Sequence, residues 1–167
     1  IQRRLYPRPL APLPGFEVAG RCDPANQVGG DYFDYFMADD KSLILVIGDV
    51  SGHGFGPSLV MAETRAAMRT MATMTDDIGT MIRQVNELLV YDNLGSFVSL
   101  FVARIDIETG VCRYASAGQP AELIRADGST ETLESGDPPL GVLSGNRLEV
   151  REAHLRPNDT LLLYTDG

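Results

Sequence analysis

The chain has 167 residues, of which 23 are acidic and 14 basic, and a formal net charge of −9. A chain of this length most simply forms one domain, and its acidic balance argues against nucleic acid as the main partner because no basic stripe is available to neutralise phosphates. No apolar run is long enough for a membrane span and no secretory signal is visible, so we expect a cytoplasmic domain without membrane contact.

The first fifteen residues are rich in proline, with four prolines between Pro7 and Pro14. Proline interrupts regular structure because it fixes one backbone angle and lacks an amide proton. We therefore predict that residues 1–15 are the remnant of a linker and that the domain spans residues 16–167.

Eight strands are expected from apolar and β-branched runs bounded by turn residues. They are Phe16–Cys22, Asp31–Met37, Leu43–Ile47, Phe97–Ile105, Val111–Ala117, Glu122–Arg125, Leu148–His154 and Thr160–Tyr164. The continuously apolar Leu43–Ile47 is typical of a strand buried on both faces. Cys22 and Cys112 match no metal spacing, and we expect them to be reduced core residues.

Two helices are expected between the third and fourth strands. Apolar residues at alternating spacings of four and three, from Val60 to Met74, predict the helix Pro57–Met74. A threonine and two aspartates then supply a cap and first-turn acids for a second helix, Asp76–Tyr91. Strands, then helices, then strands indicate an α+β fold with antiparallel sheets and helices layered outside.

Three aspartates stand beside glycines at the ends of apolar or aromatic strands. Asp49 and Asp166 each follow an apolar strand, and Asp31 precedes an aromatic one. Two carboxylates about 5 Å apart repel by roughly 3 kcal/mol at an effective dielectric constant of about 20, so a cluster of three requires protonation or a cation. Donors that are all oxygen favour Mg²⁺ or Mn²⁺. Two such ions can share a water and lower its pKa for attack at phosphorus. The alternative is that each aspartate caps a turn, while Asp34 is expected on the opposite strand face as a polar surface residue.

The loop Ser51–Gly56, directly after the apolar strand, is rich in glycine. It is a weak nucleotide signature because no lysine follows it and no parallel βαβ unit surrounds it. Ser51 and His53 are poorly spaced to act as nucleophile and base. We expect the glycines to allow close backbone approach at the start of the first helix, which lets the Val50 carbonyl serve as a metal ligand.

Several motifs occur in an order that resembles a known family. VGGDYFD at Val28–Asp34, GDVSGHG at Gly48–Gly54 and YTDG at Tyr164–Gly167 are similar to the bacterial PP2C-type phosphatases of the stage-II-sporulation-E and stress-regulator family. The segments Ser96–Phe101 and Ala115–Gly118 extend this resemblance over almost the whole chain. It implies a PP2C-like αββα sandwich, with two antiparallel sheets flanked by helices and two metal ions between the sheets.

The resemblance also implies an activity and its residues. Asp31, Asp49 and Asp166 would bind Mn²⁺ or Mg²⁺ with the Val50 carbonyl, and Asp49 would hold the metal-activated water. The reaction would be hydrolysis of phosphoserine or phosphothreonine on a protein partner, commonly an anti-sigma-factor antagonist of the STAS type. No nucleic acid partner is implied, and a homodimer is compatible with this arrangement.

The same resemblance gives the helices Pro57–Met74 and Asp76–Tyr91 a regulatory role. They would couple metal binding to an upstream sensory domain through the N-terminal linker.

Two features of the chain depart from the family pattern: Gln119 replaces a histidine that the family often has, and the chain stops at Gly167, before a last metal-binding aspartate of the family. We therefore expect a C-terminally truncated domain with one incomplete metal site. The alternative function is a catalytically impaired phosphatase-like module that binds a protein without turnover.

Overall fold

The protein is described by a computed structural model that covers residues 5–22, 29–92 and 95–165. Its elements are β1 (Tyr32–Met37), β2 (Ser42–Val50), α1 (Phe55–Met74), α2 (Ile78–Asp92), β3 (Val98–Asp106), β4 (Val111–Ala117), β5 (Ala121–Ile124), β6 (Thr130–Leu133), β7 (Arg151–His154) and β8 (Thr160–Leu162). A five-stranded sheet has the order β1-β2-β3-β4-β7, and a three-stranded sheet has the order β6-β5-β8. All strand pairs in both sheets are antiparallel.

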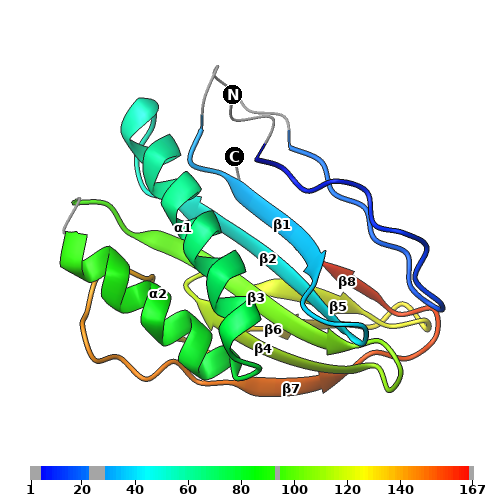
Figure 1. The fold of residues 1–167 in the computed structure, drawn as a ribbon. Coiled ribbons are helices and arrows are strands. Elements are labelled where there is room, and N and C mark those ends of the chain that lie inside the picture. Colours follow the sequence, from blue (N-terminus) through cyan, green and yellow to red (C-terminus); the bar gives the residue numbers. More distant parts are fainter. Residues whose placement is uncertain (1–4, 23–28, 93–94, 166–167) are drawn as a thin grey trace.

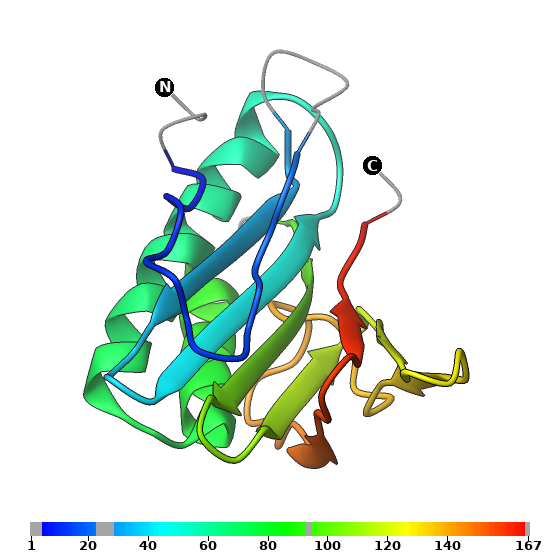
Figure 2. The same ribbon diagram turned by 90° about the vertical axis from the view of Figure 1, so that its right-hand side faces the viewer.

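The layers follow one another as helices, large sheet and small sheet (Figure 2). The predicted α+β class with two antiparallel sheets is confirmed. Within the described ranges, both helices cover the outer face of the five-stranded sheet (Figure 1). Neither of these helices is both long and apolar enough to cross a membrane.

Strand β2 contributes to two separate hydrophobic cores. Ile44 and Val46 belong to the core beneath the helices, whereas Leu43 and Ile47 belong to the core between the two sheets. Side chains of a strand alternate between its faces, so a strand covered on both sides is apolar at every position. This explains the continuous apolar run and confirms that the strand is buried on both faces.

The helices differ from the predicted ranges at their ends. Helix α1 begins at Phe55, two residues before the predicted start, and ends at Met74 as predicted. Helix α2 begins at Ile78 because Asp77 caps it: the Asp77 carboxylate accepts a 2.9 Å hydrogen bond from the Thr80 amide. The predicted start at Asp76 was therefore too early.

The predicted strand Phe16–Cys22 is wrong. Only an isolated bridge between Leu13 and Phe16 forms there, and the segment runs past β1 without joining its sheet (Figure 2). It is held by side-chain packing, with Gly20 lying against the Phe33 ring. The strand β6 was missed because three of its four residues are exposed.

The two cysteines are free and occupy different environments. Cys112 has no exposed surface, which confirms it as a core residue, and burial raises the pKa of its thiol to about 12. Cys22 is half-buried, and its sulfur lies 3.1 Å from the Tyr6 hydroxyl.

We predict that the two thiols differ in reactivity. Thiolate is the reactive species, so iodoacetamide at about pH 8.5 should label Cys22 in the folded protein and Cys112 only after denaturation. Intact-mass spectrometry measures the number of labels, and a Cys22→Ser variant should take none while folded. Rapid labelling of Cys112 in that folded variant would contradict the assignment.

Candidate metal centre

The register of β1 against β2 brings two predicted metal ligands together. Tyr32 pairs with Gly48, and the next step of the same register sets Asp31 opposite Asp49. Asp49 in turn pairs with Ser99 of β3. By strand alternation, Asp31 and Asp49 lie on the face of the large sheet that is turned toward the small sheet.

Gly30 brings the backbone of the two strands into close contact. A Cβ at this position would lie 2.7 Å from the Val50 carbonyl oxygen and 3.1 Å from Asp49 Oδ1. Only glycine leaves room for this approach. Gly30, Asp49 and the Val50 carbonyl are therefore neighbours, as a shared ligand site requires.

The donors at this place fit a hard cation. The Oδ1 atom of Asp31 is buried and has no hydrogen-bond partner among the residues that the structure describes, which is costly for a carboxylate unless a cation compensates it. The residues brought together supply only oxygen atoms, the donors that Mg²⁺ and Mn²⁺ prefer. In the described part of the chain, no group of three histidine, cysteine or acidic side chains is placed to hold a metal. Asp166, the third predicted carboxylate, lies outside the described residues.

The loop after Val50 is fixed to the start of β3. The Ser51 amide donates to the Phe97 carbonyl at 2.9 Å, and the Ser51 hydroxyl accepts from the Phe97 amide at 2.9 Å. The hydroxyl thus anchors the loop, and His53 is exposed. Gly52 and Gly54 have φ angles of 95° and 92°, and a Cβ on either would meet no crowded backbone. The close backbone approach that was expected of the loop glycines occurs at Gly30, which lies against the Val50 carbonyl. Gly52 and Gly54 instead allow the positive φ angles of the loop.

Asp34 was expected at the surface, and this expectation is wrong. It does lie on the opposite face of β1 from Asp31, but that face is covered by α1, and its side chain has no exposed surface. Arg69 of α1 donates two hydrogen bonds of 2.6 Å to its carboxylate. This bidentate geometry is the strong form of an ion pair.

Further groups complete this buried cluster. Arg65 lies 3.7 Å from the Asp34 carboxylate, and the Tyr32 hydroxyl lies 3.4 Å from it. The hydrogen bond to Asp34 raises the pKa of Arg69 above its ordinary value, and burial raises the pKa of Tyr32 well above its own. The Arg69 guanidinium also lies 4.5 Å from the centre of the Phe36 ring. The cluster fastens α1 to the strand that leads from Asp31.

Sequence reasoning also missed the role of Gln119. Its amide nitrogen donates a 2.7 Å hydrogen bond to the Tyr164 carbonyl, two residues before Asp166 in the sequence. Its amide oxygen lies 3.4 Å from the Ser99 hydroxyl, which lies 3.3 Å from the Asp49 carbonyl. The sequence marked Gln119 only as a departure from a family pattern.

Comparison with known proteins gives a family and several relatives. The family described as Stage II sporulation protein E (SpoIIE) matches residues 39–167. Protein IcfG of Synechocystis is 27% identical over 196 residues, which include 100% of this chain and 31% of IcfG. Phosphoserine phosphatase RsbU of Bacillus subtilis is 26% identical over 170 residues, which include 100% of this chain and 50% of RsbU. The chain thus spans half or less of these curated relatives.

Solved structures show the same fold. The RsbU and RsbW domains of Rv1364c from Mycobacterium tuberculosis align with a TM-score of 0.77 and 31% identity, over 87% of this chain and 41% of that one. The PP2C phosphatase domain of SpoIIE from Bacillus subtilis aligns with a TM-score of 0.75 and 20% identity, over 85% and 42%. RsbX in complex with magnesium gives a TM-score of 0.71 and 19% identity, over 85% and 68%.

We predict that Gly30→Ala weakens Mn²⁺ binding by about tenfold or more while the chain stays folded. The added methyl group must displace the Val50 carbonyl or the Asp49 side chain, and small displacements of ligand groups cost that much affinity. Calorimetric titration with Mn²⁺ measures the effect. Gly29→Ala is the matched control because its Cβ would meet only an atom at 3.9 Å; equal binding by the two variants would contradict the geometry.

Removing one partner of the buried ion pair should destabilise the fold. Arg69→Met leaves the Asp34 carboxylate without its bidentate partner, and we expect the free energy of unfolding to fall by about 3 kcal/mol. Urea denaturation measures it. Arg113→Met, which breaks an exposed pair with Glu152, should cost less than about 1 kcal/mol. Similar losses in the two variants would show that the cluster is not a major anchor.

Proposed function

The chain belongs to the stage II sporulation protein E family of PP2C-like serine phosphatases, and from this premise we propose that it is a metal-dependent protein phosphatase domain acting on phosphoserine or phosphothreonine. One observation carries this proposal: the register of the neighbouring strands β1 and β2 sets Asp31 opposite Asp49, beside the Val50 carbonyl. Because relatives of the chain are phosphatases, we assign this oxygen-rich site to metal-dependent hydrolysis of a phosphate ester. The activity is a proposal for this chain because it spans only part of those relatives.

The residues that would hold the metal are Asp31, Asp49, the Val50 carbonyl and Asp166. Mn²⁺ or Mg²⁺ suits these donors, and the relative RsbX was solved with magnesium. When bound, the ion lowers the pKa of a water and offsets charge on the phosphoryl group. The buried Oδ1 atom of Asp31 supports this assignment because no hydrogen-bond donor within residues 5–22, 29–92 and 95–165 reaches it.

The chain's own residues would hold the donors in place. Asp49, at the end of β2, would orient the water by accepting a hydrogen bond from it. The paired hydrogen bonds between Ser51 and Phe97 fix the backbone directly after the Val50 carbonyl. Donors fixed on strands lose little entropy when a substrate binds, which favours catalysis.

The proposed substrate is a phosphorylated protein, specifically an anti-sigma-factor antagonist of the STAS type. Similarity to the phosphoserine phosphatase RsbU over the whole of this chain supports it. The acidic composition is compatible with a protein partner and unfavourable for nucleic acid.

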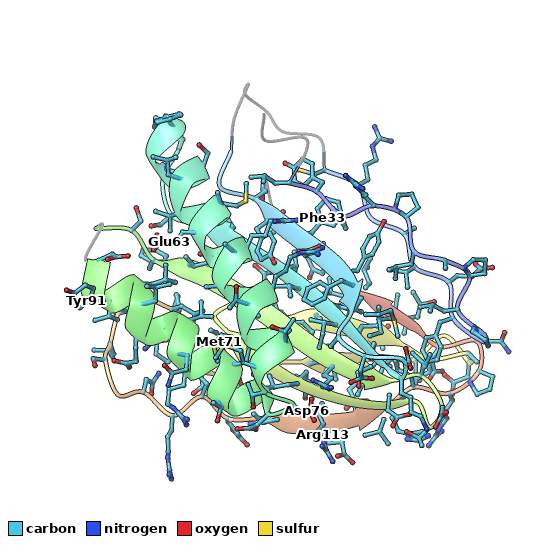
Figure 3. The ribbon with its side chains drawn as sticks, in the orientation of Figure 1. Phe33, Glu63, Met71, Asp76, Tyr91 and Arg113 are labelled. Atoms are coloured by element: carbon cyan, nitrogen blue, oxygen red, sulfur yellow. The ribbon has the colours of Figure 1, made fainter. Side chains whose placement is uncertain are left out.

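The helices α1 and α2 are proposed to be regulatory and to receive a signal from an upstream sensory domain. A groove of about 870 Å³ lies between them, with Glu63 and Met71 on its α1 side and Tyr91 on its α2 side (Figure 3). Helix α1 is also joined to β1 through Arg69 and Asp34. A shift of α1 would therefore act on the strand that follows Asp31.

We predict that the 167-residue chain releases phosphate from a phosphorylated STAS-type protein in Mn²⁺ and that EDTA stops the release. Asp49→Asn should lower the rate by about 100-fold or more because it removes a charged metal ligand. Asp40→Asn makes the same change at an exposed turn and should leave the rate unchanged. Phosphate release is followed with a colorimetric assay.

The same assay distinguishes a metal-dependent phosphatase from a phosphatase-like module that binds a protein without turnover. Full activity of the unchanged chain in EDTA would contradict metal-dependent catalysis. Binding of the phosphoprotein without any release of phosphate in Mn²⁺ would instead favour the interaction module.

A further inference from the structure

Gln119 lies in the turn between β4 and β5, on the side of the large sheet that faces the small one. Its backbone is fixed because the Ser116 hydroxyl donates a 2.8 Å hydrogen bond to its carbonyl. Ser116 is itself buried, and its backbone exchanges hydrogen bonds of 3.2 and 2.7 Å with the Ser135 hydroxyl. The Gln119 side chain is thus presented from a rigid turn.

The turn tolerates little change. Gly118 has a φ of 73°, and a Cβ there would lie 2.9 Å from Pro139. The orientation of the Gln119 amide is also determined by its partners. The Tyr164 carbonyl only accepts, so the amide nitrogen must face it, and the amide oxygen then faces the Ser99 hydroxyl.

Within the part of the chain that the structure describes, residues 163–165 have few other attachments. Strand β8 ends at Leu162, so Tyr164 lies outside the ladder of the small sheet. Tyr164 is 48% exposed, and Leu163 packs partly against the core between the sheets. A side-chain hydrogen bond of 2.7 Å is therefore a principal attachment of this segment.

The contacts of Gln119 lie between the sheet that carries Asp49 and the segment that precedes Asp166 in the sequence. On one side the Gln119 amide oxygen lies 3.4 Å from the Ser99 hydroxyl, whose single proton is shared between that oxygen and the Asp49 carbonyl oxygen at 3.3 Å. On the other side the amide nitrogen reaches Tyr164, from which the chain continues to Asp166. Groups that orient metal ligands without touching the metal commonly affect affinity by 10- to 100-fold.

We propose that Gln119 is a positioning residue that ties residues 163–165, which lead to Asp166, to the sheet that carries Asp49. This inference rests on the proposed function in so far as Asp166 binds the metal. The attachment itself is a property of the metal-free chain. It can therefore be tested with and without Mn²⁺.

The test compares Gln119→Leu, which keeps the size and removes the donor, with Gln119→His, which keeps an N–H donor. In metal-free protein, the heteronuclear nuclear Overhauser effects at the backbone amides of residues 163–165 should fall in Gln119→Leu, because the segment loses the hydrogen bond to the Tyr164 carbonyl and moves more on the ps–ns timescale. The same effects in β2 and β3 should not change. Gln119→His should resemble the unchanged chain, and so should the control Gln84→Leu on the exposed side of α2.

The second measurement is the Mn²⁺ dissociation constant, determined by calorimetry. We expect it to rise about tenfold in Gln119→Leu and to recover in Gln119→His. Unchanged nuclear Overhauser effects at residues 163–165 in Gln119→Leu would overturn the proposal, and so would a fall throughout both sheets or a histidine variant as defective as leucine. Absence of Mn²⁺ binding by the unchanged chain would overturn the proposed function and the metal part of this inference. The relaxation result would then still decide whether Gln119 is the attachment.

Discussion

The antiparallel pairing of β1 with β2 is the constraint on which the candidate site depends. One register sets Asp31 opposite Asp49 and places Gly30 against the Val50 carbonyl. A slip of one residue would turn every side chain of β1 to the other face. The buried ion pair between Asp34 and Arg69 opposes such a slip, because the slip would turn Asp34 away from α1. The attachment of α1 and the geometry of the candidate metal centre are therefore fixed together.

Strand β1 carries different chemistry on its two faces. Asp31 lies toward the small sheet, where its buried oxygen suits a cation. Asp34 lies toward α1, where Arg69 neutralises it. The two carboxylates are three residues apart. Asp34 has a cationic side chain as partner, whereas Asp31 has a buried oxygen that no described residue hydrogen-bonds. This division explains how one short segment can hold a helix on one face and present a carboxylate oxygen on the other.

Much of this arrangement could be predicted from the sequence, and the failures have physical causes. The continuous apolar run of β2 and the helical stripe of α1 report burial directly, so these elements were predicted well. The alternation of β1 correctly put Asp34 opposite Asp31 but could not tell that α1 covers that face. The arginines at positions 65 and 69 were the available signal. The contact between Gln119 and Tyr164 joins residues 45 positions apart and has no local pattern.

A site for a divalent cation formed by Asp31, Asp49 and the Val50 carbonyl would be visible in nuclear magnetic resonance spectra during titration with Mn²⁺, because the ion broadens the signals of nearby backbone amides. We expect broadening to begin at residues 30, 31, 49, 50 and 51 and to spare α2 and the turn at residues 39–41. Broadening centred on exposed carboxylates such as Glu87 and Glu108, with residues 30–31 and 49–51 unaffected, would contradict this site.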